Sequence, residues 1–190
     1  NLRCFIAIEL PEPIKRGIGE IIEILKKSNG DVRWVPSKNI HITLKFLGST
    51  PENLLTKIGE SLSNIALSYE PFYIKICNMG TFPSTRHPRV VWVGIEDSEI
   101  LKRLQKDIED SMALLGYERE DREFHPHLTI GRVRSQKGAT NLLNKLDNFR
   151  GKEFGGMKVE NIKLMRSALK PTGAEYYCLY EIPLGGRKNV

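Results

Sequence analysis

The sequence predicts a duplicated α+β fold, in which two antiparallel sheets carry helices on their outer faces. The first observation is a phrase that occurs twice, His41-Ile-Thr43-Leu and His127-Leu-Thr129-Ile, with the copies 86 positions apart in 190 residues. The second observation is that the same offset superimposes four further features. It lays Arg3 on Arg89, residues 5–9 on 91–95, residues 11–27 on 97–113, and the segment from Glu52 on that from Gly138. A common offset indicates an internal repeat, so we expect one domain, residues 1–190, of two pseudo-symmetric lobes.

The order of strands and helices follows from hydrophobic period and from turn residues. Alternating or β-branched apolar runs predict strands over 2–9, 31–35, 40–47, 71–79, 89–95, 126–133, 157–166 and 175–182. Helix-opening chemistry at Pro11, at Thr50-Pro51 and at Asp97-Ser98 accompanies helices over 11–28, 51–67, 97–115 and 139–147. Residues 79–88, 117–124 and 134–138 are predicted as loops, the first of them rich enough in Gly, Pro and basic residues to cover a ligand. A doubly wound nucleotide-binding sheet is disfavoured, because no glycine-rich phosphate loop follows the first strand.

Composition bounds the setting of the protein. A chain of 190 residues with 40% hydrophobic content can bury its own core without covalent cross-links. Cys4, Cys77 and Cys178 are odd in number and scattered, which fits neither a disulfide framework nor a zinc-ligand pattern. No run approaches the roughly 20 apolar residues of a membrane span. We therefore expect a cytoplasmic protein without a membrane segment.

The formal net charge of +6 is compatible with an ordinary lysine-rich surface and with attraction to a polyanion. The placement of the basic residues favours the second interpretation. Arg86, His87 and Arg89 cluster before a predicted strand, and Arg132 and Arg134 follow the second motif.

The repeated phrase places a histidine and a threonine on one face of each strand, because side chains two positions apart point the same way. An unperturbed imidazole has a pKa of about 6.5, so its neutral and charged forms are both present near neutral pH. One histidine can therefore accept a proton while its partner donates one. That pair suits a displacement at phosphorus, in which a base activates the nucleophile and an acid protonates the leaving oxygen. The threonine hydroxyls can donate to the phosphate oxygens as charge builds. A single His-x-Thr is frequent by chance, whereas two at matching positions of a repeat favour catalysis; His87 and His125 have no histidine counterpart at the offset and receive no catalytic role.

Several phrases together resemble the two-histidine phosphoesterase superfamily, and most of all its bacterial and archaeal RNA 2',3'-cyclic phosphodiesterases, historically called 2'-5' RNA ligases. The phrases are Phe5-Ile-Ala-Ile, His41-Ile-Thr43-Leu-Lys-Phe-Leu-Gly48, Gly80-Thr-Phe-Pro83, Pro88-Arg-Val-Val-Trp92, His125-Pro-His127-Leu-Thr129-Ile-Gly-Arg132, Ser167-Ala-Leu-Lys-Pro-Thr-Gly-Ala174 and Tyr176-Tyr177. The resemblance implies a bilobal fold with a central cleft lined by both motifs. It also implies opening of a terminal 2',3'-cyclic phosphate to a 2'-phosphate, with a weak reversible 2'-5' ligation, and it calls for no metal and no cofactor.

The resemblance assigns roles to particular residues. His41 is implied as the proton donor, His127 as the proton acceptor, and Thr43 and Thr129 as the residues that bind the phosphate. Arg132 matches a recurrent arginine of the family, yet strict alternation places it on the opposite strand face from His127. The aromatic residues Phe5, Phe82 and Tyr177 are candidates for stacking on a base, although each can equally be part of the core.

The implied partner is an RNA with a 2',3'-cyclic phosphate terminus, tRNA halves being one such substrate, and the protein is expected to be a monomer. Two alternatives remain open at this point. One is a phosphodiesterase for a small cyclic-phosphate nucleotide or a 2'-5' oligoadenylate. The other is a non-catalytic module that binds RNA ends through basic residues.

Overall fold

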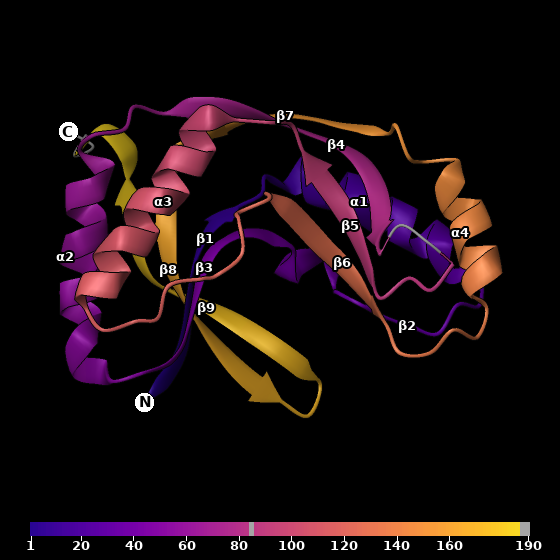
Figure 1. Ribbon diagram of the computed structural model, residues 1–190, viewed down its shortest axis with the longest axis horizontal. Helices are drawn as coiled ribbons and strands as arrows, with labels where there is room; N and C mark the ends of the chain where they lie inside the picture. Colours follow the sequence, from indigo (N-terminus) through magenta and orange to yellow (C-terminus); the bar gives the residue numbers. More distant parts are fainter. Residues whose placement is uncertain (84–85, 187–190) are drawn as a thin grey trace.

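The computed structural model describes residues 1–83 and 86–186 (Figure 1). Over these residues the chain forms four α-helices and two sheets, whose paired strands all run antiparallel. The four-stranded sheet has the order β3-β1-β8-β9, and the five-stranded sheet has the order β2-β6-β5-β4-β7. The predicted α+β fold with two antiparallel sheets is confirmed.

The elements have the following bounds. The strands are β1 Leu2–Glu9, β2 Val32–Trp34, β3 His41–Thr50, β4 Phe72–Phe82, β5 Val90–Ile95, β6 His127–Val133, β7 Glu153–Val159, β8 Asn161–Lys170 and β9 Gly173–Pro183. The α-helices are α1 Glu12–Lys26, α2 Leu55–Ala66, α3 Glu99–Leu114 and α4 Ala139–Asp147. Short 3-10 turns are η1 Ser37–Asn39, η2 Glu52–Leu54 and η3 Leu184–Gly186.

The two sheets match position by position, but they are not built from the two halves of the chain separately. β3, β1, β8 and β9 occupy the same places in one sheet as β6, β5, β4 and β7 in the other. The third strand is exchanged, because β8 comes late in the chain yet joins β1, whereas β4 comes early and joins β5. The helices cross over as well: α3 follows β5 but packs against β3 and α2, and α1 follows β1 but contacts β7 and α4. The two sheets are therefore tied together by the chain itself.

The helices bury one apolar face each, as their residue spacing predicts. In α1 this face holds Ile14, Ile18, Ile21, Ile22 and Leu25, and in α3 it holds Leu101, Leu104, Ile108 and Met112. Ser98 caps α3 by accepting a hydrogen bond from the Leu101 amide at 3.2 Å, close to the predicted helix start. These faces and the inward residues of both sheets form one continuous core.

Two sequence-based element predictions were wrong in detail. The single strand expected over 157–166 is two strands, because β7 ends at Val159 in one sheet and β8 begins at Asn161 in the other. The apolar alternation shifts by one residue at Glu160-Asn161, where the chain changes sheet, and the expected single strand overlooked that shift. The loop expected over 79–88 begins later, since residues 79–82 complete β4; its residues 84–85 lie outside the described part.

Candidate active site

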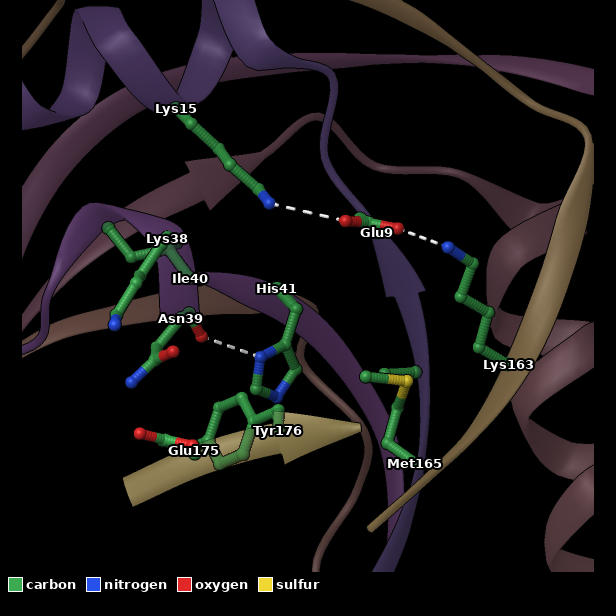
Figure 2. Close-up of a pocket in the computed structure, with 11 residues that line it drawn as sticks. Glu9, Lys15, Lys38, Asn39, Ile40, His41, Lys163, Met165, Glu175 and Tyr176 are labelled. Carbon is green, nitrogen blue, oxygen red and sulfur yellow. Dashed lines mark hydrogen bonds and ion pairs between the residues drawn. The ribbon is translucent and has the colours of Figure 1, made fainter. Parts of the chain in front are cut away.

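The histidine of the first motif is the first residue of β3, and its ring is held from two directions. The Nδ1 atom lies 2.7 Å from the carbonyl oxygen of Asn39 in η1. A carbonyl oxygen only accepts, so Nδ1 carries the proton and donates it, which leaves Nε2 for chemistry. The ring stacks on Phe5 at 4.8 Å between centroids and meets the edge of Tyr176 at 5.3 Å. Figure 2 shows the Asn39 bond on one side of His41 and Tyr176 below the ring.

The histidine of the second motif repeats this arrangement. His127 is the first residue of β6, and its Nδ1 lies 2.7 Å from the carbonyl oxygen of His125, again two residues earlier. The same tautomer follows, with Nε2 available in both copies. The surroundings differ, because His127 is exposed whereas His41 is half-buried. His125, predicted to have no catalytic role, supplies only its backbone oxygen in this contact.

Each motif strand contains an extra residue, a β-bulge, directly after the threonine of the motif. In β3, Thr43 pairs with Ala7 and Lys45 with Ile6, which leaves Leu44 as the extra residue. In β6, Thr129 pairs with Trp92 and Gly131 with Val91, which leaves Ile130 as the extra residue. A bulge of this kind reverses the alternation of side chains beyond it. Thr43 and Thr129 remain half-buried on the faces of their histidines.

The bulge corrects the placement of Arg132. Strict alternation put it opposite His127, but the bulge at Ile130 returns it to the histidine face, where it is exposed. Its charge, together with that of Arg3, acts on the Tyr176 hydroxyl and opposes the rise that burial imposes on the pKa of that tyrosine. Since Tyr176 touches the His41 ring, Arg132 lies within electrostatic reach of the first motif. Among the described residues Arg132 has no carboxylate partner.

The equivalent bulge in β3, at Leu44, exposes Phe46. Phe46 is the residue that corresponds to Arg132 at the 86-residue offset. Its side chain is 71% exposed, and its ring centroid lies 6.3 Å from that of Phe5. Phe46 was not predicted from the sequence, because the period of a strand gives no sign of a bulge. The shared offset of Phe46 and Arg132 is the signal that could have found both.

The candidate aromatic residues have different surroundings. Phe5 is 4% exposed and covers the His41 ring, which favours the packing role over stacking on a base. Phe82 ends β4 and is 66% exposed. Tyr177 is 42% exposed and donates a hydrogen bond to Glu175 at 2.6 Å, whereas its neighbour Tyr176 contacts the histidine. Sequence reasoning selected Tyr177 of this pair and missed Tyr176.

Charged residues surround His41 on the side away from Tyr176. The Glu9 carboxylate lies between two ammonium groups, Lys15 at 3.4 Å and Lys163 in closer contact (Figure 2). Burial lowers the pKa of His41, and the positive charge of Lys15 lowers it further. The Asn39 carbonyl and the Glu9 carboxylate act in the opposite direction. In the protein without substrate, the His41 imidazole is therefore biased toward its neutral form.

A pocket of about 420 Å³ opens beside His41. Its lining residues come from β1, α1, η1, β3, β8 and β9, and they are Ala7, Glu9, Lys15, Lys38, Asn39, Ile40, His41, Lys163, Met165, Glu175 and Tyr176. His127, Thr43 and Thr129 are not among them. The second motif comes near through the strands, since β3 and β6 contact each other although they belong to different sheets.

Two further observations concern the described residues only. No group of three or more His, Cys, Asp or Glu side chains there is arranged to hold a metal ion. No helix there is both long enough and apolar enough to cross a membrane.

The fold and the two motif strands define a class of protein that comparisons with known proteins identify. A family model described as the 2'-5' RNA ligase superfamily matches residues 10–171. The chain belongs to this superfamily. Two relatives named RNA 2',3'-cyclic phosphodiesterase agree with it over nearly their whole length. The one from Methanothermobacter thermautotrophicus is 35% identical over 93% of this chain and 95% of its own, and the one from Methanocaldococcus jannaschii is 36% identical over 95% and 99%.

A solved structure gives the same answer for the fold. The crystal structure of TT0787 from Thermus thermophilus superimposes with a TM-score of 0.77 and 27% sequence identity, covering 98% of this chain and all of that one. The arrangement of the two sheets is therefore shared with a solved structure and is not peculiar to this chain.

Proposed function

We propose that this protein is an RNA 2',3'-cyclic phosphodiesterase, which opens a terminal 2',3'-cyclic phosphate to a 2'-phosphate. The observation that carries the proposal is the matched pair of histidines, each with Nδ1 bonded to the carbonyl two residues earlier and with Nε2 available. The names of the relatives support the substrate. The contact between β3 and β6 supports a cleft in which both imidazoles flank one phosphate.

The proposed reaction is an in-line displacement at phosphorus. His127 Nε2 takes a proton from water, whose oxygen forms a bond to phosphorus. The bond from phosphorus to the 3' oxygen breaks, and His41 Nε2 gives its proton to that oxygen. The products are a 3' hydroxyl and a 2'-phosphate, and the net proton balance of the two histidines is restored by transfer to solvent. With the 5' hydroxyl of a second RNA as nucleophile in place of water, the same steps give a 2'-5' linkage, and their reversal cleaves it.

The threonine hydroxyls and the Arg132 guanidinium have different proposed roles in binding the phosphate. Thr43 and Thr129 lie on the histidine faces of their strands and donate hydroxyl hydrogen bonds to the non-bridging oxygens. Arg132, now placed on the same face and without a carboxylate partner among the described residues, supplies positive charge to the same oxygens. An arginine suits this task, since its planar guanidinium presents several donors at once.

The lowered pKa of His41 bears on its proposed role as the donor. A proton donor must be charged before the reaction, yet burial disfavours the imidazolium. A phosphate anion placed next to the ring favours the charged form. We therefore propose that the substrate itself completes the donor, so that His41 becomes protonated as the cyclic phosphate binds.

The substrate is proposed to be an RNA terminus, with tRNA halves as one source, and the protein is proposed to act as a cytoplasmic monomer. The lining of the pocket beside His41 holds three lysines, Lys15, Lys38 and Lys163, against two carboxylates, Glu9 and Glu175. The excess of one positive charge, together with Arg132 beyond the pocket, supports an anionic partner such as an RNA. Three free cysteines, two of them buried, are compatible with a reducing compartment.

The test is product analysis after incubation with an RNA oligonucleotide that ends in a 2',3'-cyclic phosphate, in the presence of EDTA. Phosphorus NMR should show conversion of the cyclic phosphate to a 2'-phosphate, and His41→Ala and His127→Ala should each lose most of this conversion. Tight binding of the unchanged RNA by the native protein would instead indicate a module that binds RNA ends. Faster turnover of a nucleoside 2',3'-cyclic phosphate than of the oligonucleotide would assign a small-molecule substrate.

A further inference from the structure

A buried ion pair lies directly behind the first motif. The ammonium of Lys45, in β3, contacts the carboxylate of Glu109, in α3, at 2.6 Å. The two side chains are only 6% and 12% exposed. Removing both charges from water costs several kcal/mol per ion, about as much as their attraction returns, so such a pair is weak evidence for stability. The proposed reaction uses neither residue, and the pair therefore needs another explanation.

The Glu109 carboxylate joins three segments of the chain. Its Oε1 accepts from Lys45 and also from the backbone amide of Glu120 at 2.9 Å. Its Oε2 accepts from the side-chain amide of Gln105 at 3.3 Å. Lys45 donates a second hydrogen bond, to the carbonyl oxygen of Glu118 at 3.0 Å. Both charged groups of the pair are thus held by more than one hydrogen bond.

One end of the network reaches the bulge of the first motif. The Gln105 amide also lies 3.3 Å from the carbonyl oxygen of Leu44, the extra residue after Thr43. A bulge leaves its residue outside the regular ladder of hydrogen bonds. Gln105 thus donates a hydrogen bond to Leu44, the bulge residue that sets the directions of the Thr43 and Lys45 side chains.

The other end of the network reaches the approach to the second motif. Residues 115–126 connect α3 to β6 without helix or strand, and Glu118 and Glu120 lie in this connection. The same connection supplies the His125 carbonyl that holds the His127 ring at 2.7 Å. A connection without regular structure has few backbone bonds of its own, so side-chain contacts restrain its path. These are the contacts of Lys45 and Glu109, together with those of Tyr117 with Thr50 and of Arg119 with Asp110.

We propose that Lys45, Gln105 and Glu109 form a positioning unit that sets the two catalytic histidines relative to each other. The unit is anchored on α3, which follows β5 of the five-stranded sheet but packs against β3 of the four-stranded sheet. It therefore links β3 of the four-stranded sheet to the connection that leads into β6 of the five-stranded sheet. This inference rests on the proposed function, in which both histidines act on one phosphate, and none of the three residues touches the substrate.

The physical consequence is a loss of rate without a matching loss of binding. When two groups act on one phosphate, the reaction rate depends on the distance between them. A misplacement of about 1 Å can reduce that rate by about a hundredfold. A variant without the unit should bind the RNA through its unchanged cationic residues. We expect kcat to fall and KM to change little.

The decisive variant is the double substitution Lys45→Met with Glu109→Met. Each single substitution leaves a buried charge without its partner and should destabilise the protein. The double variant removes both charges and keeps similar side-chain volumes, so its melting temperature should return to near that of the native protein. If the pair acts only in stability, activity should return with it. If the unit positions the histidines, kcat should stay at least about tenfold low.

The matched control is the exposed pair Lys75–Glu153, which joins β4 and β7 at a similar distance of 2.7 Å. Lys75→Met with Glu153→Met should leave both melting temperature and kcat near their native values. A second variant, Gln105→Met, keeps the ion pair but removes the donor to Leu44 and to Glu109 Oε2. It should lower the melting temperature modestly, because buried acceptors lose their donor, and it should lower kcat measured well below that temperature. This variant keeps the proposal testable if the double variant does not fold.

The readout includes a signal that does not require turnover. Imidazole resonances of His41 and His127 in the free protein should shift in the double variant and in Gln105→Met, but not in the control. Native kcat in either variant with undisturbed resonances would overturn the positioning unit. Absence of cyclic-phosphate opening by the native protein would instead overturn the proposed function, and the resonances would still report whether the unit positions the rings.

Discussion

The ring of Phe5 lies nearly parallel to the ring of His41, with 4.8 Å between centroids and 24° between planes. His127 has the same backbone hydrogen bond but is exposed. The pseudo-symmetric pair of imidazoles is therefore placed in two unlike environments, one covered by an aromatic ring and one open to water. Burial by itself disfavours the charged form that His41 must hold as the proposed acid, so the bound phosphate anion has to favour the imidazolium there.

The first prediction concerns the two histidines together. His41→Ala and His127→Ala should each remove most of the cyclic phosphodiesterase activity, measured as kcat with saturating RNA. The double variant should be little worse than either single one, because groups that act as a unit are strongly non-additive. His125→Ala is the matched control, since His125 contributes its backbone oxygen and should retain activity. Near-native turnover of His41→Ala beside an inactive His127→Ala would exclude the two-imidazole mechanism.

The second prediction concerns the threonines. Thr43→Val and Thr129→Val keep the shape of the side chain and remove one hydroxyl donor each. Loss of one donor to developing negative charge reduces kcat by up to about a hundred- to a thousandfold in the strongest analogous cases. We expect each variant to lose about tenfold or more and to remain more active than the histidine variants. Thr140→Val, on the exposed start of α4, is the control. Equal activity of all three variants would show that neither motif threonine contacts the phosphate.

Much of the fold could be predicted because the repeat constrains it. The bounds of β1 and α4 match the expected ranges residue for residue, since apolar period and end residues agree there. The offset also predicted that β3 and β6 would be equivalent strands, and they occupy equivalent places in the two sheets. What the sequence did not reveal is the exchange of β4 and β8 between the sheets, because pairing depends on distant partners that local patterns do not encode.

The candidate site was partly predictable for the same reason. The repeated His-x-Thr located two strand faces, but Arg132 was placed wrongly because a bulge depends on how the partner strand pairs. Gly131 gives a partial signal after the fact: a Cβ there would lie 2.8 Å from Trp34, so only glycine lets β2 cover the bulged strand. Asn39 and Tyr176 were not predicted. The Asn39 carbonyl reaches His41 only because the chain turns between them, and Tyr176 is far from His41 in the sequence.

The third prediction tests the corrected position of Arg132. Arg132→Ala should lower kcat/KM by about tenfold or more, since it removes a charged donor from the histidine face. Arg132→Lys should recover only part of the loss, because a single ammonium cannot reproduce the planar donors of arginine. Arg134→Ala, two residues further on and also exposed, should cost little beyond general attraction of RNA. If Arg132→Ala and Arg134→Ala are equally mild, then Arg132 acts only through long-range charge.

The fourth prediction follows from the lowered pKa of His41. As the proposed donor, His41 must be charged, so kcat/KM, which reports the free enzyme, should decline as pH rises through that lowered pKa. The corresponding limb of kcat, which reports the bound complex, should lie at higher pH, because the substrate anion favours the imidazolium. Lys15→Gln should move the kcat/KM limb upward, since the Lys15 charge lowers the pKa of His41.

The same shift has a consequence for stability, with a definite sign. The pKa of His41 is lower in the folded protein than in the unfolded chain, so the unfolded chain binds more protons between the two values. The contribution of the neutral ring to stability is therefore present above the unfolded pKa of about 6.5 and is lost as pH falls through the folded pKa. Denaturant titrations from about pH 7.5 down to about pH 5 should show the native protein losing more unfolding free energy than His41→Gln, which cannot titrate. Parallel losses in the two proteins would mean that the ring is as well solvated in the folded protein as in the unfolded chain. The kcat/KM limb, which reports the free enzyme, would then be expected near the unperturbed value of about 6.5.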